Sequence, residues 1–285
     1  MKLILFLLSM IILHSSCNRE VCNISFELQD QQIGLSSAHN SRQLGGYCIG
    51  NKTIRKDVLL RTARLSSLSE EDSILLADKY RVQRIYDFRG HEESQASPDV
   101  IPGKARYVSL SISFGNSAAN TGSEREMIAM LLKYADNPMI QEMCDKMYDK
   151  IFFEEESQKV YRRFFEDLMT FDPEDGAVLW HCTQGKDRAG SASAMLLAAL
   201  GADRDLIMAD FTLSKDYYDP HVSMIPVEND TQRNVINTLI SANPAIFEKT
   251  LDKVDAQYGS LRYYLTECIG VTPEMMETLR ERYLE

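Results

Sequence analysis

The stretch that decides the fold is Ala177-Val178-Leu179-Trp180-His181-Cys182-Thr183-Gln184-Gly185-Lys186-Asp187-Arg188, which continues into a segment of small residues from Ala189 to Leu200. The apolar run 177–180 predicts a short buried strand, and the segment 189–200, which Gly201 follows, predicts a helix. A loop between a buried strand and a helix N-terminus directs several backbone N–H groups toward one point. The loop therefore predicts a binding site for a tetrahedral oxyanion.

Two residues of this loop have the side chains that phosphoryl transfer requires. Five residues separate Cys182 from Arg188, so Arg188 can fold back and grip two phosphate oxygens in bidentate fashion. Cys182 would lie at the bottom of the cradle, where the helix dipole, the N–H groups and Arg188 favour a thiolate. A thiolate beneath a bound phosphoryl group is an in-line nucleophile. The alternative is an inert buried thiol beside an arginine that only begins a helix.

The other loop residues support this prediction. Gly185 lets the backbone bend tightly because no Cβ is in the way. His181 is expected to hydrogen-bond around the loop and help to hold the thiolate, or else only to pack at the strand end. Lys186 is expected to be a point charge at the rim, and Thr183 and Gln184 complete the phosphate-binding segment.

The composition is that of an ordinary globular protein with an acidic balance. The 285 residues are 44% apolar and 26% charged, with 31 Lys plus Arg against 42 Asp plus Glu, so the formal net charge is −11. Such a chain is a poor general binder of nucleic acid or anionic membranes, so an anionic ligand must meet a local positive site. No His, Asp or Glu cluster has the spacing of metal ligands, and we expect neither a metal nor a cofactor.

Strands alternate with helices along the chain, which predicts an α/β fold with a mostly parallel central sheet flanked by helices. A helical insertion, 123–171, precedes the phosphate loop. Its Met and Phe residues could form a mobile lid, but the packing of two or three helices in the core is the simpler interpretation. The expected strands are 58–60, 82–88, 107–112 and 177–180, and the expected later helices are about 204–217, 230–242, 245–257, 260–268 and 273–284.

The N-terminus predicts an export signal. Lys2 precedes an apolar run from Leu3 to Leu13, which is too short to span a bilayer and fits the hydrophobic region of a signal peptide. Small residues just before Cys17 resemble the processing site of a bacterial lipoprotein. The alternative is a secretory signal that is cut nearby. We therefore expect a lipoprotein signal peptide at 1–16, a tether at 17–29 and a single domain at 30–285.

The mature protein would then be exported and would contact a membrane only through the lipid on Cys17, on the periplasmic side or at the cell surface. Export also implies an oxidising compartment, in which disulfides can form. Cys22 and Cys48 could pair across the N-terminal segment, or they could be buried free thiols.

The sequence also resembles a known family. His181 to Arg188 resembles the phosphate-binding signature of the cysteine-based protein-tyrosine phosphatases. The longer string to Gly190 is similar to a bacterial branch of tyrosine phosphatases, some of which also accept phosphoserine or phosphoinositides. The resemblance extends over roughly 30–284 through Asn40 to Tyr47, Leu60 to Leu65, Asp87 to Arg89 and a helical tail from Tyr258 to Leu279.

This resemblance implies a phosphatase-like fold and a phosphomonoester hydrolase that works through a cysteinyl-phosphate, without metal or cofactor. The implied substrate is a phosphotyrosine protein or a small phosphomonoester, with inositol phosphates or phosphoinositides as the alternative. Phosphoinositide-directed relatives often carry two lysines in the loop, whereas Thr183 takes the first of those positions here. A non-catalytic phosphate-binding module is the alternative from another class.

Two departures from the family bear on turnover. Ala189 stands where the family usually has a Ser or Thr that helps the cysteine to leave, and Ser191 is the nearest hydroxyl along the helix. Gln43 replaces the usual Asp of the N-terminal motif.

The leaving oxygen needs a proton, so a carboxylic acid should reach it. The resemblance suggests Asp187, which could instead only stabilise the loop through backbone hydrogen bonds. Asp87, at the end of a neighbouring strand, is the rival. Several further arginines could extend the pocket, but structural ion pairs are the simpler interpretation; these are Arg42, Arg61, Arg64 and Arg89.

Overall fold

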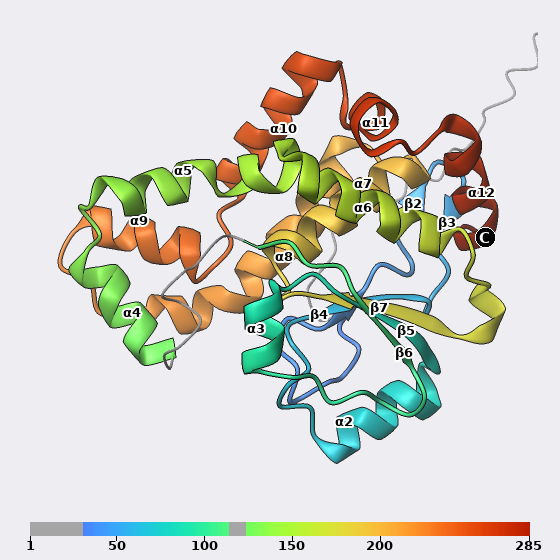
Figure 1. Cartoon of the computed structure of the whole chain (residues 1–285), viewed down its shortest axis with the longest axis horizontal. Coiled ribbons are helices and arrows are strands. Elements are labelled where there is room, and N and C mark those ends of the chain that lie inside the picture. Colours follow the sequence, from blue (N-terminus) through green and yellow to red (C-terminus); the bar gives the residue numbers. More distant parts are fainter. Residues whose placement is uncertain (1–30, 114–123) are drawn as a thin grey trace, which may run out of the picture.

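The computed structural model describes residues 31–113 and 124–285 and has a five-stranded sheet at its centre (Figure 1). The strand order is β1-β4-β7-β5-β6; four strands run parallel, and β1 pairs antiparallel with β4. The predicted α/β fold with a mostly parallel sheet is confirmed. The strands are β1 Arg42–Gln43, β4 Leu59–Thr62, β5 Val82–Asp87, β6 Arg106–Ser109 and β7 Ala177–His181, with a separate ribbon of β2 Cys48–Ile49 and β3 Lys52–Thr53.

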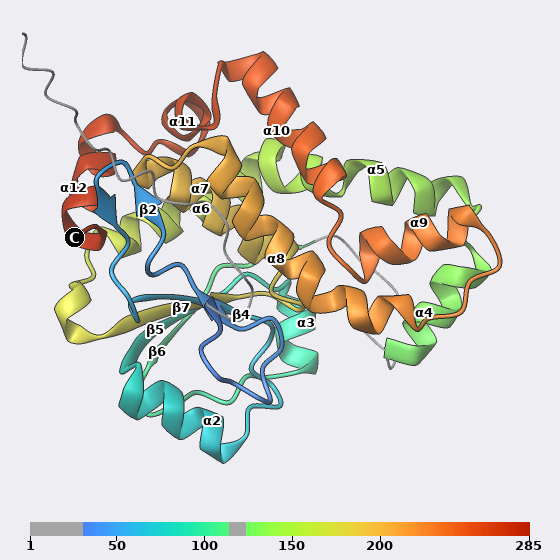
Figure 2. The same ribbon diagram turned by 180° about the vertical axis from the view of Figure 1, so that it is seen from behind.

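Helices cover both faces of the sheet, as the two opposite views show (Figures 1 and 2). On one face lies α2 Glu70–Ile74, which continues as the π-helical turn Leu75–Lys79, and α3 His91–Ala96 lies near the end of β5. The larger layer on the other face contains α6 Glu155–Leu168, α7 Asp187–Leu200, α8 Arg204–Ser223, α10 Pro244–Tyr258, α11 Leu261–Tyr264 with the π-helical turn Leu265–Ile269, and α12 Pro273–Tyr283.

The central strand β7 explains why the run 177–180 is uninterruptedly apolar. Val178 and Trp180 pack into the core beneath α6 and α7, whereas Ala177 and Leu179 pack into the core on the α2 side. A strand that is buried on both faces reads as continuous hydrophobic sequence. Phe164 of α6 packs edge-on against Trp180, with 5.8 Å between ring centroids, so the insertion contributes directly to the main core.

The predicted helical insertion is confirmed, and its helices pack rather than standing free. It consists of α4 Glu124–Lys133, α5 Pro138–Phe153 and α6. Residues of α4 and α5 pack with the end of α8 and with α9 Asp230–Leu239 in a third apolar cluster, beside the α/β body. We call this side of the molecule the helical lobe; its buried residues include Leu131, Cys144, Val222, Val235 and Ile236.

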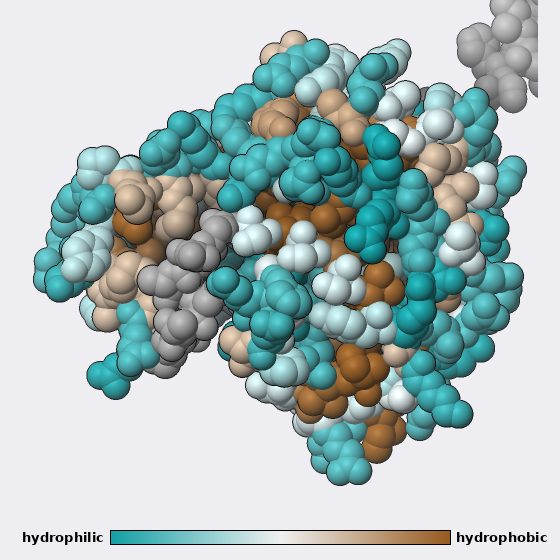
Figure 3. All heavy atoms as spheres, viewed as in Figure 1, coloured by the Kyte–Doolittle hydropathy of each residue, from teal (hydrophilic) through white to brown (hydrophobic). Residues whose placement is uncertain are grey.

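The face seen in Figure 3 is mostly hydrophilic, with patches of apolar residues between the hydrophilic ones. No helix in the described ranges is both long enough and apolar enough to cross a lipid bilayer. The predicted signal peptide 1–16, the tether 17–29 and the lipidation site Cys17 lie outside the described residues.

Candidate active site

The phosphate loop lies between the buried end of β7 and the first turn of α7, as predicted. Cys182 follows the strand directly and is 2% exposed. Gly185 has a φ of +66°, and a Cβ at this position would lie 2.5 Å from the backbone carbonyl of Thr62. The turn therefore needs glycine both for its left-handed backbone and for the close approach of the neighbouring strand.

The carbonyl groups of the loop are held on its outer side by side chains from three distant segments. Asn40 Nδ2 donates to the carbonyls of Gly185 and Gln184, at 3.1 and 3.3 Å. Arg61 Nη2 donates to the Gly185 carbonyl at 2.8 Å, and the Tyr218 hydroxyl donates to the Gln184 carbonyl at 2.7 Å. Because the C=O and N–H of a trans peptide point in opposite directions, these bonds turn the N–H groups inward. The arrangement can hold an oxyanion over Cys182.

A buried ion cluster supports this bracing. The Asp210 carboxylate accepts from Arg42 Nε at 3.2 Å, from Arg61 Nη1 at 2.6 Å and from the Tyr47 hydroxyl at 3.0 Å. Burial raises the pKa of Asp210, but the two guanidinium charges outweigh it and hold that pKa below its ordinary value. Burial and the neighbouring charge of Arg42 lower the pKa of Arg61 to about 10.

The interpretation of the additional arginines as structural ion-pair partners is confirmed for three of them. Arg42 and Arg61 pair with Asp210, and Arg89 pairs with two carboxylates near β5, all in the interior. Arg64 is exposed, and its backbone N–H donates to the Thr183 carbonyl at 3.2 Å.

The guanidinium of Arg188 is held by a carboxylate that the sequence analysis missed. Its Nη1 and Nη2 donate to Glu93 Oε2 and Oε1 at 2.6 and 3.0 Å. Nη2 also donates to the Thr183 hydroxyl at 3.1 Å, and that hydroxyl donates to Glu93 Oε1 at 2.6 Å. Nη1 further reaches the backbone carbonyls of Ile112 and Phe88. Arg188 is therefore fixed at the first turn of α7 before any ligand binds.

Glu93 is strongly acidic in this setting. Burial raises its pKa, but the hydrogen bonds and charge of Arg188 outweigh that effect and lower the pKa to about 2. One sequence signal could have pointed to Glu93. It stands three residues after Gly90, the residue that precedes α3, and a glutamate at this position often accepts a hydrogen bond from the backbone N–H at the helix start. Here the Gly90 N–H donates to Glu93 Oε2 at 2.8 Å.

His181 lies in a buried charged group behind the loop. Its Nδ1 is 3.2 Å from the Cys182 carbonyl oxygen and 3.7 Å from Asp87 Oδ1, and its Nε2 is 3.1 Å from Asp99 Oδ2 without a well-directed hydrogen bond. Ligand atoms of His181, Asp87 and Asp99 lie within 4.8 Å of one another, a grouping that could hold a metal ion and that sequence spacing did not reveal. Arg89 donates to both carboxylates at 2.7 Å, so its guanidinium already supplies a cation there.

The two candidate acids differ in accessibility. The Asp187 carboxylate is 15% exposed at the start of α7. It accepts from the Tyr148 hydroxyl at 2.7 Å and pairs with Lys186 at 2.9 Å.

The expectation that Lys186 lies at the rim is wrong: its side chain is 1% exposed, because Nζ turns inward to Asp187 and toward the Thr238 carbonyl at 3.4 Å. Gln184 likewise turns toward the lobe, where its Nε2 donates to the Ile240 carbonyl at 3.4 Å.

Asp87 is enclosed. Its carboxylate is 1% exposed, and both oxygens accept from Arg89 while Oδ2 also accepts from the Tyr107 hydroxyl at 2.8 Å. Burial raises the pKa of Asp87, but the charge of His181 and the bonds from Arg89 outweigh it and keep the pKa below its ordinary value. The geometry therefore makes Asp87 a fixed anion.

The hydroxyl that contacts Arg188 comes from the loop and not from the helix. Ala189 is fully buried, and the buried Ser191 hydroxyl has no hydrogen-bond partner in the described part of the chain. Thr183 instead supplies a hydroxyl beside both Arg188 and Glu93.

Cys48 is disulfide-bonded, so the alternative of a free thiol is wrong for this residue. Cys144, Cys182 and Cys268 are free thiols, and Cys22 lies outside the described residues.

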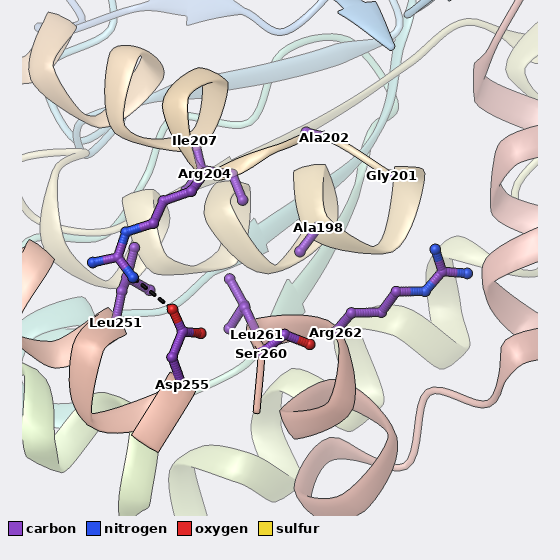
Figure 4. A pocket seen from close by; sticks show the side chains of 10 residues that line it. All are labelled: Ala198, Gly201, Ala202, Arg204, Ile207, Leu251, Asp255, Ser260, Leu261 and Arg262. Carbon is purple, nitrogen blue, oxygen red and sulfur yellow. Dashed lines mark hydrogen bonds and ion pairs between the residues drawn. The ribbon is translucent and has the colours of Figure 1, made fainter. Parts of the chain in front are cut away.

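A cavity of about 220 Å³ lies at the opposite end of α7 from the loop (Figure 4). Its charged group Arg204 is already paired with Asp252 and Asp255, at 2.5 and 2.7 Å, and Arg262 points away from this pair. The helix α7 separates it from the loop by about 20 Å at 1.5 Å per residue. This cavity does not belong to the phosphate site; its apolar lining is Ala198, Ala202, Ile207, Leu251 and Leu261.

The sequence of this chain is similar to those of known proteins. A family model described as the tyrosine phosphatase family matches residues 33–285. A protein of Cupriavidus necator, provisionally named a tyrosine-protein phosphatase, is 24% identical over 265 residues, which is 88% of each chain. A tyrosine-protein phosphatase of Nostoc commune is 28% identical over 58% of this chain and 51% of its own. The triple specificity protein phosphatase PtpB of Mycobacterium tuberculosis is 30% identical over 36% of this chain and 42% of its own.

The Glu93–Arg188 pair should make stability depend on pH. Because the pKa of Glu93 falls from the ordinary 4.5 to about 2, the carboxylate stabilises the fold fully above pH 4.5, and this contribution is lost as the pH falls toward 2. We expect Glu93→Gln to lower the free energy of unfolding by about 3 kcal/mol at pH 7 and by clearly less at pH 3 in urea titrations. The exposed Glu142→Gln should leave the midpoint unchanged. A loss for Glu93→Gln that is equal at both pH values would contradict the ion-pair explanation.

Proposed function

This chain belongs to the tyrosine phosphatase family, and from that membership we propose that Cys182 and Arg188 carry out its phosphatase reaction through a cysteinyl-phosphate. The protein is a protein-tyrosine phosphatase, a hydrolase of phosphomonoesters. The observation that carries the proposed mechanism is that Asn40, Arg61 and Tyr218 bind the loop carbonyls from outside the loop. The loop N–H groups are then directed inward, above Cys182.

In the first proposed step, the Cys182 thiolate attacks phosphorus in line with the leaving oxygen. The S–P bond forms, the P–O bond to the tyrosine breaks, and the leaving oxygen takes a proton from Asp187. The loop N–H groups and Arg188 stabilise the charge on the equatorial oxygens. In the second step, water attacks phosphorus, Asp187 takes its proton and the S–P bond breaks, which returns the thiolate and releases phosphate.

Accessibility supports Asp187 as the acid. Its carboxylate reaches the surface beside Arg188, whereas Asp87 is enclosed and bonded through both oxygens to Arg89. A general acid must be protonated in the competent form and must touch the leaving group. Asp87 meets neither condition, so we assign it to holding Arg89 and His181 in place.

The loop supports turnover and a phosphotyrosine substrate over the alternatives. The Thr183 hydroxyl bonds both Arg188 and Glu93 and helps to hold the guanidinium in place, which supports a hydrolase over a non-catalytic phosphate-binding module. Lys186 is turned into the interior toward Asp187 and Thr238. It therefore does not present a charge to a second phosphate, as an inositol phosphate or phosphoinositide would require.

We also propose that the protein is an exported lipoprotein that is anchored through Cys17. The apolar run and the small residues before Cys17 support this location. The disulfide at Cys48 also supports it, because disulfides persist in oxidising compartments.

Cys182→Ser should abolish hydrolysis of a phosphotyrosine peptide while inorganic phosphate or vanadate still binds, because the loop N–H groups and Arg188 remain. Initial-rate assays and calorimetric titration measure the two properties. Cys268→Ser, which removes another free thiol, is the matched control and should retain full activity. Activity near that of the wild type in Cys182→Ser would refute the proposed nucleophile.

Asp187→Asn should slow phenyl phosphate much more than nitrophenyl phosphate, because the nitrophenolate ion leaves without a proton. General acids contribute about 10²–10⁴-fold, so the phenyl phosphate rate should fall within that range. The high-pH limb of the wild-type rate profile should flatten in the variant. If Asp87→Asn showed the leaving-group dependence and Asp187→Asn slowed both substrates equally, the acid would be Asp87.

Lipidation predicts that the wild-type protein fractionates with membranes and that Cys17→Ser releases it or blocks its processing. Fractionation followed by N-terminal mass analysis tests this. Recovery of the wild-type protein entirely in the soluble fraction, starting at another residue, would exclude the anchor.

A further inference from the structure

A second cavity, of about 360 Å³, lies between the α5–α6 corner and the segment that follows β6. Figure 1 shows α5 and α6 on the same side of the molecule as the segment that follows β6. We call this cavity the corner pocket; its lining residues are Ser111, Ile112, Ser113, Lys150, Glu154, Glu156 and Ser157.

The corner pocket adjoins residues that contact Arg188. The backbone carbonyl of Ile112, which lines it, accepts from Arg188 Nη1 at 3.0 Å. Helix α6, which contributes Ser157 to the pocket lining, also contacts Arg188, because the Tyr161 hydroxyl of α6 donates to the Arg188 carbonyl at 3.0 Å. The corner pocket therefore shares Ile112 and α6 with the surroundings of Arg188.

One polar side chain that lines the pocket, Ser157, has no hydrogen-bond partner within the part of the chain that the structure describes. Ser157 is 3% exposed, and its hydroxyl makes no hydrogen bond to any residue that the structure describes. Buried hydroxyl groups are generally hydrogen-bonded. A ligand group that enters the pocket would satisfy this one.

The charge of the pocket favours a cation. Glu154 is 53% exposed and lies 4.0 Å from Lys150, at the limit of an ion pair, so its carboxylate is weakly engaged. Glu156 pairs with Lys159, outside the pocket, at 2.8 Å. Because Lys159 already neutralises Glu156, Glu154 is the one loosely paired carboxylate among the described residues that line the pocket. A planar guanidinium could pair with Glu154 and also donate to the Ser157 hydroxyl, which a point-charge ammonium does less well.

We propose that the corner pocket binds an arginine side chain that flanks the phosphotyrosine of a protein substrate. The inference rests on the proposed function, since it deepens the choice of substrate at that site. Glu154 supplies the charge and Ser157 an additional hydrogen bond. The pocket thereby gives the enzyme a preference among phosphotyrosine sequences that the phosphate loop alone cannot provide.

The test measures binding in the Cys182→Ser background, so that it does not depend on turnover. Two phosphotyrosine peptides are compared by calorimetry, one with arginine on both sides of the phosphotyrosine and one with alanine there. We expect the arginine peptide to bind about tenfold more tightly, a typical effect for one charged hydrogen-bonded pair. Adding Glu154→Gln should reduce this ratio at least threefold, and adding Ser157→Ala should reduce it about twofold.

Glu142→Gln is the matched control, because it removes the same charge from exposed α5 while leaving the corner pocket intact. It should leave the affinity ratio and the wild-type turnover of nitrophenyl phosphate unchanged. An affinity ratio near one, or an equal loss in Glu142→Gln and Glu154→Gln, would overturn the inference, since the latter reflects only the overall negative field. A preserved ratio without turnover of any phosphoester by the wild-type enzyme would refute the proposed function but not the pocket.

Discussion

The carboxylate of Asp210, buried between the guanidinium groups of Arg42 and Arg61, is the contact on which the phosphate loop depends. Arg61 bonds Asp210 through one nitrogen and the Gly185 carbonyl through the other, so the position of α8 is transmitted to the loop. Asn40 acts in the same way, because it bonds both that carbonyl and Arg42. Removing one member of a buried ion pair leaves an uncompensated charge, which typically costs about 3–5 kcal/mol. The carbonyl groups of the loop are thus held in place by a buried ion cluster through Arg61 and Asn40.

Although the chain has a formal net charge of −11, the carboxylates buried near the phosphate loop are paired with arginine side chains. Asp210 stands against two arginines, Glu93 against Arg188, and Asp87 with Asp99 against Arg89. The Asp210 group has two guanidinium charges against one carboxylate and the Glu93 pair is balanced, so the carboxylates of these two groups are compensated beside the loop N–H groups and the α7 dipole. The acidic surface then affects which substrates approach, and the loosely paired Glu154 can act at the corner pocket.

The helical insertion contributes to the site as well as to the core. Its Tyr148 bonds Asp187 and its Tyr161 bonds the Arg188 carbonyl, while the loop residues Lys186 and Gln184 reach carbonyls near the end of α9. The loop is therefore held between the α/β body and the helical lobe. This explains why Lys186, a rim charge by its sequence position, is buried.

Local sequence was sufficient for the four parallel strands of the sheet and for the position of the loop between a buried strand and a helix, but not for the edge strand β1. Buried strands, small-residue helices and a turn that needs glycine are each encoded within a few consecutive residues. The same local patterns predicted the helical insertion but not the helices against which it packs, α8 and α9. Asp99, Asp210 and the Ser157 hydroxyl at the corner pocket had no comparable signal, and Glu93 had only its position at a helix start, because charge pairing and burial depend on residues tens to more than a hundred positions apart. The sequence by itself determined which atoms could react, and only the tertiary structure decided which charges surround them, since electrostatic interactions follow distance in space rather than along the chain.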